Sequence, residues 1–289
     1  MFSRILLAVD GSECAYRAAT FGLELAATYD ADVEALFVSG GKIPRQPGAE
    51  PDVSLRERGE RALDEVASEG EDAGVDVETR FAEGRPQTRI VDRADETNAD
   101  LVVMGQQGHT GLGERLLGSA LTRVLRNTDV PVLAVPAGLR DGAPEFGDVL
   151  VPTDGSDASR RAAPYGADVA RRYGVTLHLL SVLDVQREAG IFDVGGVSEA
   201  YVDRLLEQAR ENVDDLSDAA GDLDDLDVVR DVVRGRAHTG VREYVEAEDV
   251  GLVVIASRGE TSFTGQALGS VTDRVLRVLA VPVLVVPVA

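Results

Sequence analysis

The chain has 289 residues, 44% of them hydrophobic, and a formal net charge of −22 at pH 7. This length and apolar content suffice for two ordinary domains, each with its own core. A charge this negative repels nucleic acids and anionic membrane surfaces, so we expect neither as a partner. Because Lys42 is the only lysine, the acidic composition is typical either of a surface kept soluble by charge or of one adapted to high salt, as in halophiles.

The N-terminal apolar run at residues 5–9 leads directly into Asp10-Gly-Ser12 and lacks the form of a signal peptide. No apolar run reaches the length of a membrane span. Cys14 is the only cysteine, which excludes an intrachain disulfide. We therefore expect a cytoplasmic protein with no membrane association.

Short aliphatic runs alternate with helical patterns along the whole chain. The first half predicts strands at 5–9, 33–38, 75–81, 101–104 and 130–135, and helices at 13–29, 53–73, from Pro86 and from Ser119. The second half predicts strands at 149–151, 175–182, 226–233, 252–255 and 281–286, and helices at 157–173, 198–219, 237–247 and 270–279. This alternation predicts an α/β fold with two tandem, doubly wound, five-stranded parallel-sheet domains.

The two halves are copies of each other. Asp10-Gly-Ser12 recurs at Asp154-Gly-Ser156, an offset of 144 residues (154 − 10), and Gly118-Ser119 recurs at Gly269-Ser270, an offset of 151 (269 − 118). A period this long indicates duplicated domains, since solenoid repeats are far shorter. We predict domains at 1–137 and 147–289, joined by a Gly- and Pro-containing linker at 138–146.

A glycine-rich loop follows the predicted fourth strand of each half. The first reads Gly105-Gln-Gln-Gly108, nine residues, then Gly118-Ser119; the second reads Ala256-Ser-Arg-Gly259, nine residues, then Gly269-Ser270. Such glycines can serve a tight turn alone. Backbone N–H groups of such loops and of helix N-termini also bind phosphate without a cationic side chain, which is the interpretation we favour. The spacing fits neither a P-loop, which needs lysine, nor the dinucleotide fingerprint.

Asp10 and Asp154 stand directly after the first predicted strand of each half. Each could form a local turn or helix cap, or accept hydrogen bonds from a ribose or an adenine amine. Doubly wound sheets bind ligands at the carboxyl ends of their strands, where the strand order reverses. If the first and fourth strands are neighbours, each aspartate faces its own glycine loop.

The histidines fit no metal or Ser/His/Asp pattern, so we predict no metal site and no catalytic residue. His109 could donate to phosphate, His178 is expected in the core, and His238 lies in the first turn of a helix. Four arginines near the loops are expected to be surface or salt-bridge residues, Arg258 being the best placed to contact phosphate: Arg115, Arg123, Arg258 and Arg274.

In these features the chain resembles the universal stress protein family in its tandem form, whose nucleotide-binding members carry Gly-x2-Gly-x9-Gly-(Ser/Thr). Residues 105–119 match this motif completely, and residues 256–270 match it except at Ala256. The resemblance implies an adenine nucleotide alpha hydrolase-like fold with strand order 3-2-1-4-5. It also implies that the fifth strands, at the two Val-Pro-Val segments, pair in an intrachain pseudo-dimer, with a further homodimer as an option.

By the same resemblance the ligand is ATP with Mg²⁺ or Mn²⁺. Adenine is expected at Val38 or Val182 and at Met104 or Ile255, and ribose at Asp10 or Asp154. Phosphates are expected at Gly105, Gly108, Gly118 and Ser119, or at Gly259, Gly269 and Ser270. Because Ala256 departs from the motif, the first site is the stronger candidate.

The leading hypothesis is therefore an ATP-binding stress or regulatory protein that is not an enzyme. A slow ATPase is the first alternative, although a cationic group for the γ-phosphate and a positioned base are not evident. The second is a nucleotide-free protein-interaction module, against which the intact first loop argues.

Overall fold

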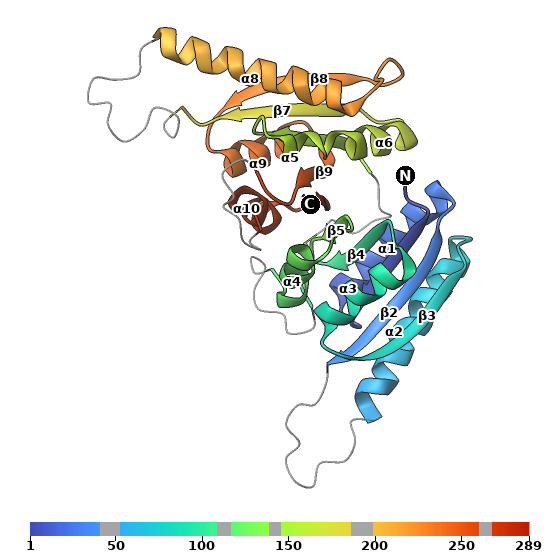
Figure 1. The fold of residues 1–289 in the computed structure, drawn as a ribbon. Helices are drawn as coiled ribbons and strands as arrows, with labels where there is room; N and C mark the ends of the chain where they lie inside the picture. The colour runs from blue at the N-terminus through green and yellow to red at the C-terminus, as the bar shows by residue number, and fades with distance from the viewer. Residues whose placement is uncertain (41–52, 109–116, 139–145, 186–198, 260–267, 289) are drawn as a thin grey trace. The chain divides into compact units, whose positions relative to one another are not determined.

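The computed structural model describes residues 1–40, 53–108, 117–138, 146–185, 199–259 and 268–288. Lys42, His109 and Arg115 lie outside these residues, as does most of the predicted linker. The chain divides into two compact units, Met1–Pro144 and Glu145–Ala289 (Figure 1).

The first unit is a parallel five-stranded sheet with helices on both faces. Its elements are β1 (Arg4–Val9), α1 (Glu13–Tyr29), β2 (Asp32–Gly40), α2 (Val53–Asp72), β3 (Val77–Gly84), α3 (Pro86–Thr97), β4 (Leu101–Gly105), α4 (Ser119–Asn127) and β5 (Val132–Val135). The strand order is β3-β2-β1-β4-β5, and every pair is parallel. Helix α1 packs beside α2 and α3 beside α4, as a doubly wound sheet requires.

The second unit repeats this topology. Its elements are β6 (Asp148–Thr153), α5 (Asp157–Arg160), α6 (Ala163–Tyr173), β7 (Leu177–Leu183), α8 (Glu199–Ala220), β8 (Val228–Arg234), α9 (Ala237–Ala247), β9 (Val250–Ala256), α10 (Ser270–Val278) and β10 (Val283–Val286). Its order, β8-β7-β6-β9-β10, again places the first strand beside the fourth. Both sheets confirm the predicted order 3-2-1-4-5.

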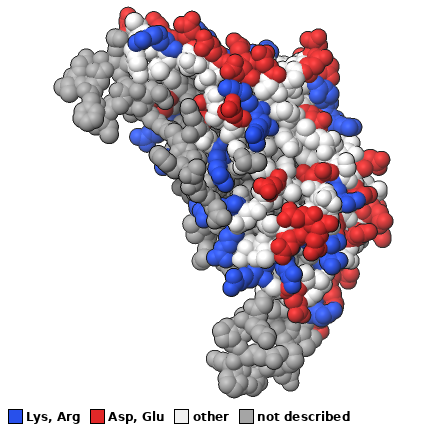
Figure 2. All heavy atoms as spheres, viewed as in Figure 1, with Lys and Arg blue, Asp and Glu red and all other residues white. Residues whose placement is uncertain are grey.

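The central strands carry unbroken aliphatic runs because both faces of each sheet are covered. Ile5, Leu6 and Leu7 of β1 are fully buried, as are Val149, Leu150 and Val151 of β6. Apart from the buried Glu34, the acidic residues of the described chain lie outside this core, and Figure 2 shows acidic residues spread over the visible surface with arginines among them.

One helix that the sequence predicts as continuous is broken in the structure. The pattern at 157–173 predicts a single helix, whereas the structure has two, α5 and α6. Pro164 explains the break, since it has no N–H to donate to the carbonyl of Arg160 and its ring would clash with that carbonyl. At the corresponding position of the first unit, 144 residues earlier, stands Thr20, and α1 runs unbroken.

Phe146, which the sequence places in the linker, belongs to the packed second unit. Its ring lies 4.5 Å from that of Tyr173, centroid to centroid, and the residue is buried. The second unit therefore begins at or before residue 146.

Each unit buries one polar pair between its second strand and its third helix. In the first unit, Arg93 Nη2 donates to Glu34 Oε2 at 2.6 Å and Arg93 Nε donates to Glu34 Oε1 at 2.8 Å. This carboxylate raises the pKa of Arg93 above its usual value. In the second unit, at offsets of 144 and 151, stand His178 and Tyr244, with Nδ1 and Oη 2.9 Å apart. The same backbone positions hold an arginine–carboxylate pair in one copy and a histidine–tyrosine pair in the other, where His178 also meets Asp148 and Tyr244 donates to Asp231.

The Glu34–Arg93 pair predicts a clear difference between two charge-matched substitutions. Glu34→Gln removes the buried carboxylate from Arg93, whose side chain is only 20% exposed and keeps only the exposed Glu96 as a charged partner, and should lower the free energy of unfolding by about 2 kcal/mol. Glu60→Gln breaks the exposed Arg56–Glu60 pair and should change it by less than about 0.5 kcal/mol. Urea unfolding followed by circular dichroism compares them, and equal losses would contradict this account.

Candidate functional site

The turn after β1 has a local structure that its three residues dictate. Ser12 caps α1, its Oγ accepting from the N–H of Ala15 at 3.2 Å, and the N–H of Ser12 donates to Asp10 Oδ1 at 3.0 Å. Gly11, at φ 76°, supplies the left-handed residue that the turn needs. Asp10 thus forms the local turn that the sequence offered as one alternative.

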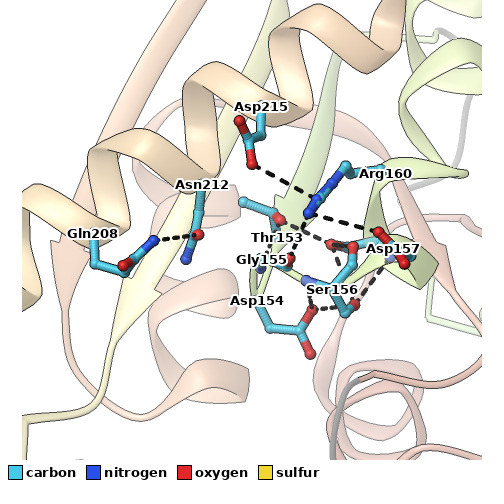
Figure 3. A network of polar contacts seen from close by, with 10 residues as sticks. Thr153, Asp154, Gly155, Ser156, Asp157, Arg160, Gln208, Asn212 and Asp215 are labelled. Carbon is cyan, nitrogen blue, oxygen red and sulfur yellow. Dashed lines mark hydrogen bonds and ion pairs between the residues drawn. The ribbon is translucent and has the colours of Figure 1, made fainter.

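The turn after β6 is built in the same way and is covered by α8 (Figure 3). Asp154 Oδ1 accepts from the N–H of Ser156 at 3.2 Å and from its hydroxyl at 2.5 Å. A Cβ on Gly155 would lie 2.6 Å from Asn212 Oδ1, so α8 packs directly on this turn. Gln208, one turn earlier on α8, donates to Asn212 Oδ1 at 3.4 Å.

The second carboxylate oxygen of each aspartate faces the glycine loop. Strands β1 and β4 are paired, with Ala8 opposite Met104. A Cβ on Gly108 would lie 2.7 Å from Asp10 Oδ2, and a Cβ on Gly259 would overlap Asp154 Oδ2. The predicted juxtaposition of aspartate and loop is therefore confirmed in both units, and neither second glycine has room for a side chain.

Each loop is closed by main-chain hydrogen bonds. The N–H of Gln106 donates to the carbonyl of Val135 at 2.8 Å, and the N–H of Gly118 donates to the carbonyl of Gln106 at 2.7 Å. In the second unit the N–H of Gly269 donates to the carbonyl of Ser257 at 2.8 Å. Gly118 and Gly269 thus close the loop and offer a ligand no backbone donor, contrary to the expectation of a free N–H at each.

The donors that remain belong to the next residues, at the N-termini of α4 and α10. Ser119 and Ser270 are the first residues of these helices, whose first N–H groups have no acceptor within the helix. No side chain in the described part of the chain caps either helix, whereas Ser12 and Ser156 cap α1 and α5. These two N-termini therefore point free donors and a partial positive charge toward the aspartates' end of the sheet.

Gly105 and Ala256 differ for a packing reason. Neither has a positive φ, so Ala256 carries no backbone strain. A Cβ on Gly105 would lie 2.8 Å from Cys14 Sγ and 2.9 Å from the Cys14 carbonyl carbon. At the position of Cys14 the second unit has Ala158, 144 residues later. In the second unit, the small Ala158 therefore leaves room for the methyl group of Ala256. The packing gives no reason to rank the first site above the second.

Cys14 itself is buried beneath the first loop. Its Sγ lies 3.4 Å from the carbonyl oxygen of Val135, and burial raises the pKa of its thiol. Such a thiol packs as a small apolar side chain and is poorly reactive.

In the second unit these elements line a cavity of about 850 Å³. The cavity is bounded by the turn after β6, the ends of β7 and β9, the loop before α10, and the side chains of α8 and α9. It contains all six residues that the sequence assigned to this site: Asp154, Val182, Ile255, Gly259, Gly269 and Ser270.

The first unit has its predicted site residues at the corresponding end of its own sheet. Asp10 follows β1, Val38 lies near the end of β2, and Gly105 ends β4 after Met104. Val38 and Met104 are buried, so their side chains belong mainly to the core.

Three arginines and a histidine line the cavity of the second unit. Among the described residues no carboxylate pairs with Arg236, Arg258 or Arg274. Arg274 is exposed, as one of the two alternatives predicted, and Arg258 is partly buried. The pKa of His238 is lowered, first by burial and then by Arg274, Arg236 and Arg242.

Sequence reasoning missed Arg236, His238 and Arg274 as lining residues, and it also missed Asn212 and Gln208. The offset of 151 shows arginines at 85 and 236 and at 123 and 274. Arginines near helix starts are common, however. Their recurrence in both halves does not show whether they lie on the surface or line a cavity.

Among the described residues there is no group of three His, Cys, Asp or Glu side chains able to hold a metal ion. Nor does any helix in this described set combine the length and apolarity needed to cross a membrane.

Comparison with known proteins gives a consistent family. The family model described as "Universal stress protein family" matches residues 1–136 and 145–287. A universal stress protein of Mycolicibacterium smegmatis is 30% identical over 98% of this chain and 96% of its own length. One from Methanocaldococcus jannaschii is 37% identical over 47% of this chain and 82% of its own. The crystal structure of a universal stress protein from Archaeoglobus fulgidus superposes with a TM-score of 0.69, at 25% identity, over 98% of this chain and 96% of that one.

The packing at the loops predicts that substitutions at the corresponding positions 105 and 256 differ in their effect on stability. Gly105→Ala forces a methyl against Cys14 and should lower the free energy of unfolding by about 1 to 3 kcal/mol. Ala256→Gly removes a methyl from an unstrained position and should lower it by no more than about 1 kcal/mol.

Cys14→Ala combined with Gly105→Ala should recover only part of the first loss, because the main chain of residue 14 stays in place. Thermal unfolding provides the comparison. A fully stable Gly105→Ala variant would show that packing does not require this glycine.

Proposed function

The chain belongs to the universal stress protein family, and from that premise we propose that it is an ATP-binding regulatory protein whose state depends on bound nucleotide. The observation that carries this proposal is the cavity of the second unit, where Asp154, the loop residue Gly259 and the uncapped N-terminus of α10 meet. A carboxylate suits a ribose or an adenine amine, and main-chain amides at a helix N-terminus suit phosphate.

The size and chemistry of the cavity fit an adenine nucleotide. Its volume of about 850 Å³ lies within the range of roughly 300 to 1,000 Å³ usual for small-molecule sites. Its walls combine the aliphatic side chains of Val182, Leu205 and Ile255 with polar groups at one end. An aromatic base and an anionic chain need that division.

Mg²⁺ or Mn²⁺ accompanies the nucleotide in this proposal. Such ions are commonly held by one or two carboxylates together with the phosphates of the ligand. Asp154 is the carboxylate that faces the second loop, at Gly259. The metal would neutralise phosphate charge at the site.

We propose that the protein acts in the cytoplasm by binding rather than by turnover. The tandem arrangement of two universal stress protein domains is consistent with the intrachain pseudo-dimer that the sequence predicts. The two glycine loops argue against the nucleotide-free alternative, because Gly108 and Gly259 each bring the main chain close to the facing aspartate.

Calorimetric titration of the full chain with MgATP at constant high salt tests the proposal. Wild type should bind ATP below the millimolar range. Gly108→Val should abolish the first site and Gly259→Val the second, because each side chain would displace the facing aspartate. The double variant should bind nothing, with the same helical circular dichroism spectrum as wild type. Absence of ATP binding by the wild type would leave the nucleotide-free alternative standing.

A single-turnover assay with radiolabelled ATP tests the absence of catalysis. Phosphoryl transfer needs a positioned base and a held metal as well as cationic charge. We expect bound ATP to be hydrolysed at close to its uncatalysed rate. A hydrolysis rate that rises in proportion to enzyme, and that Gly259→Val removes, would instead favour the ATPase.

A further inference from the structure

We infer that His178 carries a proton on both ring nitrogens in the folded protein, and that this buried imidazolium is a pH-sensitive anchor that fastens α9 to the sheet of the second unit. The inference goes beyond the proposed function and does not depend on a bound nucleotide.

His178 is the middle of a chain of four side chains that links β6, β7, β8 and α9. Its Nε2 lies 3.2 Å from Asp148 Oδ2 on β6, and its Nδ1 lies 2.9 Å from Tyr244 Oη on α9. Tyr244 Oη donates in turn to Asp231 Oδ2 on β8 at 2.8 Å. His178 and Tyr244 are buried, so the centre of this chain is shielded from water.

The donors and acceptors of the chain require two protons on the imidazole ring. Tyr244 has one hydroxyl proton, and that proton goes to Asp231. Burial, and then the hydrogen bond to Asp231, raise the pKa of Tyr244, which therefore stays protonated. Its oxygen can only accept from His178, so Nδ1 must carry a proton. Asp148, as a carboxylate, can only accept as well, so Nε2 must carry the second proton.

The charged groups on this side of the sheet favour a cation at His178. Side chains of β7 alternate, with Leu177 facing α6 and His178 facing α9. The charged neighbours of His178 and Tyr244 are carboxylates from three elements: Asp148 of β6, Asp231 of β8 and Glu248 directly after α9.

Two arginines of the same elements have other partners. Arg230 of β8 donates to Ser217 of α8 at 2.7 Å, and Arg242 of α9 lies 3.8 Å from Glu243. Within the described ranges no arginine forms an ion pair with Asp148 or Asp231. His178 is therefore the group that can balance their charge.

The first unit has the reverse arrangement of charge. At the offsets of 144 and 151, the corresponding residues are Arg4, Glu34, Arg80 and Arg93. Its second strand carries an anion that pairs with an arginine of the third helix, and arginines stand at the positions of Asp148 and Asp231. A cation at position 178 completes this reversal and meets the requirement that a buried charge be paired.

The position of Tyr244 makes the imidazolium an anchor for α9. Tyr244 supplies hydrogen bonds from α9 to both β7 and β8, while Ala237 and His238 of the same helix line the cavity. An unfolded chain loses its histidine protons near about pH 6.5. An imidazolium with two partners only in the folded state contributes stability that is fully present below that pH. This contribution is lost as the pH rises and the folded ring gives up its proton.

Hydrogen exchange of the full chain tests the anchor. Exchange is followed by mass spectrometry from about pH 6 to about pH 9 at fixed KCl, and rates are corrected for the intrinsic pH dependence of exchange. Protection of the α9 amides should fall by about tenfold over this range, as for the loss of a hydrogen bond to a charged group. Helix α3 is the internal control, because its Glu34–Arg93 pair contains no histidine, and its protection should stay within about twofold. Equal changes in the two helices, or no change in α9, would overturn the inference.

Three variants identify the titrating group. His178→Gln keeps a polar side chain that cannot become charged, so α9 should lose its pH dependence. Asp148→Asn keeps an acceptor for the N–H of Thr176 and removes the opposing charge, so the fall in protection should move to lower pH. His238→Gln is the matched control, on the same helix but outside the chain of four, and should keep the wild-type profile.

An unchanged profile in His178→Gln or Asp148→Asn, or a lost pH dependence in His238→Gln, would overturn the inference. Should His178→Gln fail to fold, Asp148→Asn still decides the matter. Nitrogen NMR spectra of the imidazole rings test the protons directly. At about pH 7 both ring nitrogens of His178 should show the chemical shift of a protonated nitrogen. A single protonated ring nitrogen would contradict the inference, whether the other proton lies on Asp148 or is absent.

Discussion

The close approach of an aspartate to a glycine loop is the constraint on which the rest of the structure depends. It exists because β1 is hydrogen-bonded to β4, and β6 to β9, so that the residues after each strand meet at one edge. The contact between Asp10 and Gly108 leaves no room for a side chain. This approach is preserved by the turns, by the loop closure and by the direction of the following helix. It leaves main-chain amides, rather than side chains, as the groups next to each aspartate.

Duplication has kept this backbone while changing the side chains that support it. Glu34 and Arg93 form a largely buried ion pair where the second unit has a histidine and a tyrosine in contact. Gly105 packs under Cys14, whereas the second unit has alanine at both corresponding positions. In each case a change at one position is matched by a change at its neighbour, as dense packing and the cost of unpaired buried charge require. A departure from the motif, such as Ala256, thus fits the side chains that pack around it in its own unit.

Hydrophobic periodicity predicted nearly all elements. The strand order was implied by the resemblance to the family, and the facing of aspartate and loop followed from that order because ligand-binding residues of such sheets meet at the carboxyl ends of the strands. Sequence reasoning missed the break at Pro164, where a proline in a helical pattern was given too little weight. It could not predict which arginines are paired, since pairing depends on neighbours far apart along the chain. Arg274 and Arg277 lie three residues apart on α10, yet only Arg277 meets a carboxylate among the described residues.

The two candidate sites share the main-chain groups of their loops and helix N-termini, and they differ in the side chains around them. Main-chain donors would let the proposed phosphate site exist in a chain of net charge −22, because they carry partial positive charge without any cationic side chain. In the second unit Arg236, Arg258 and Arg274 line the cavity together with the carboxylates of Asp154 and Asp184. A ligand of the proposed kind would therefore meet both main-chain donors and cations inside a chain whose overall charge repels anions.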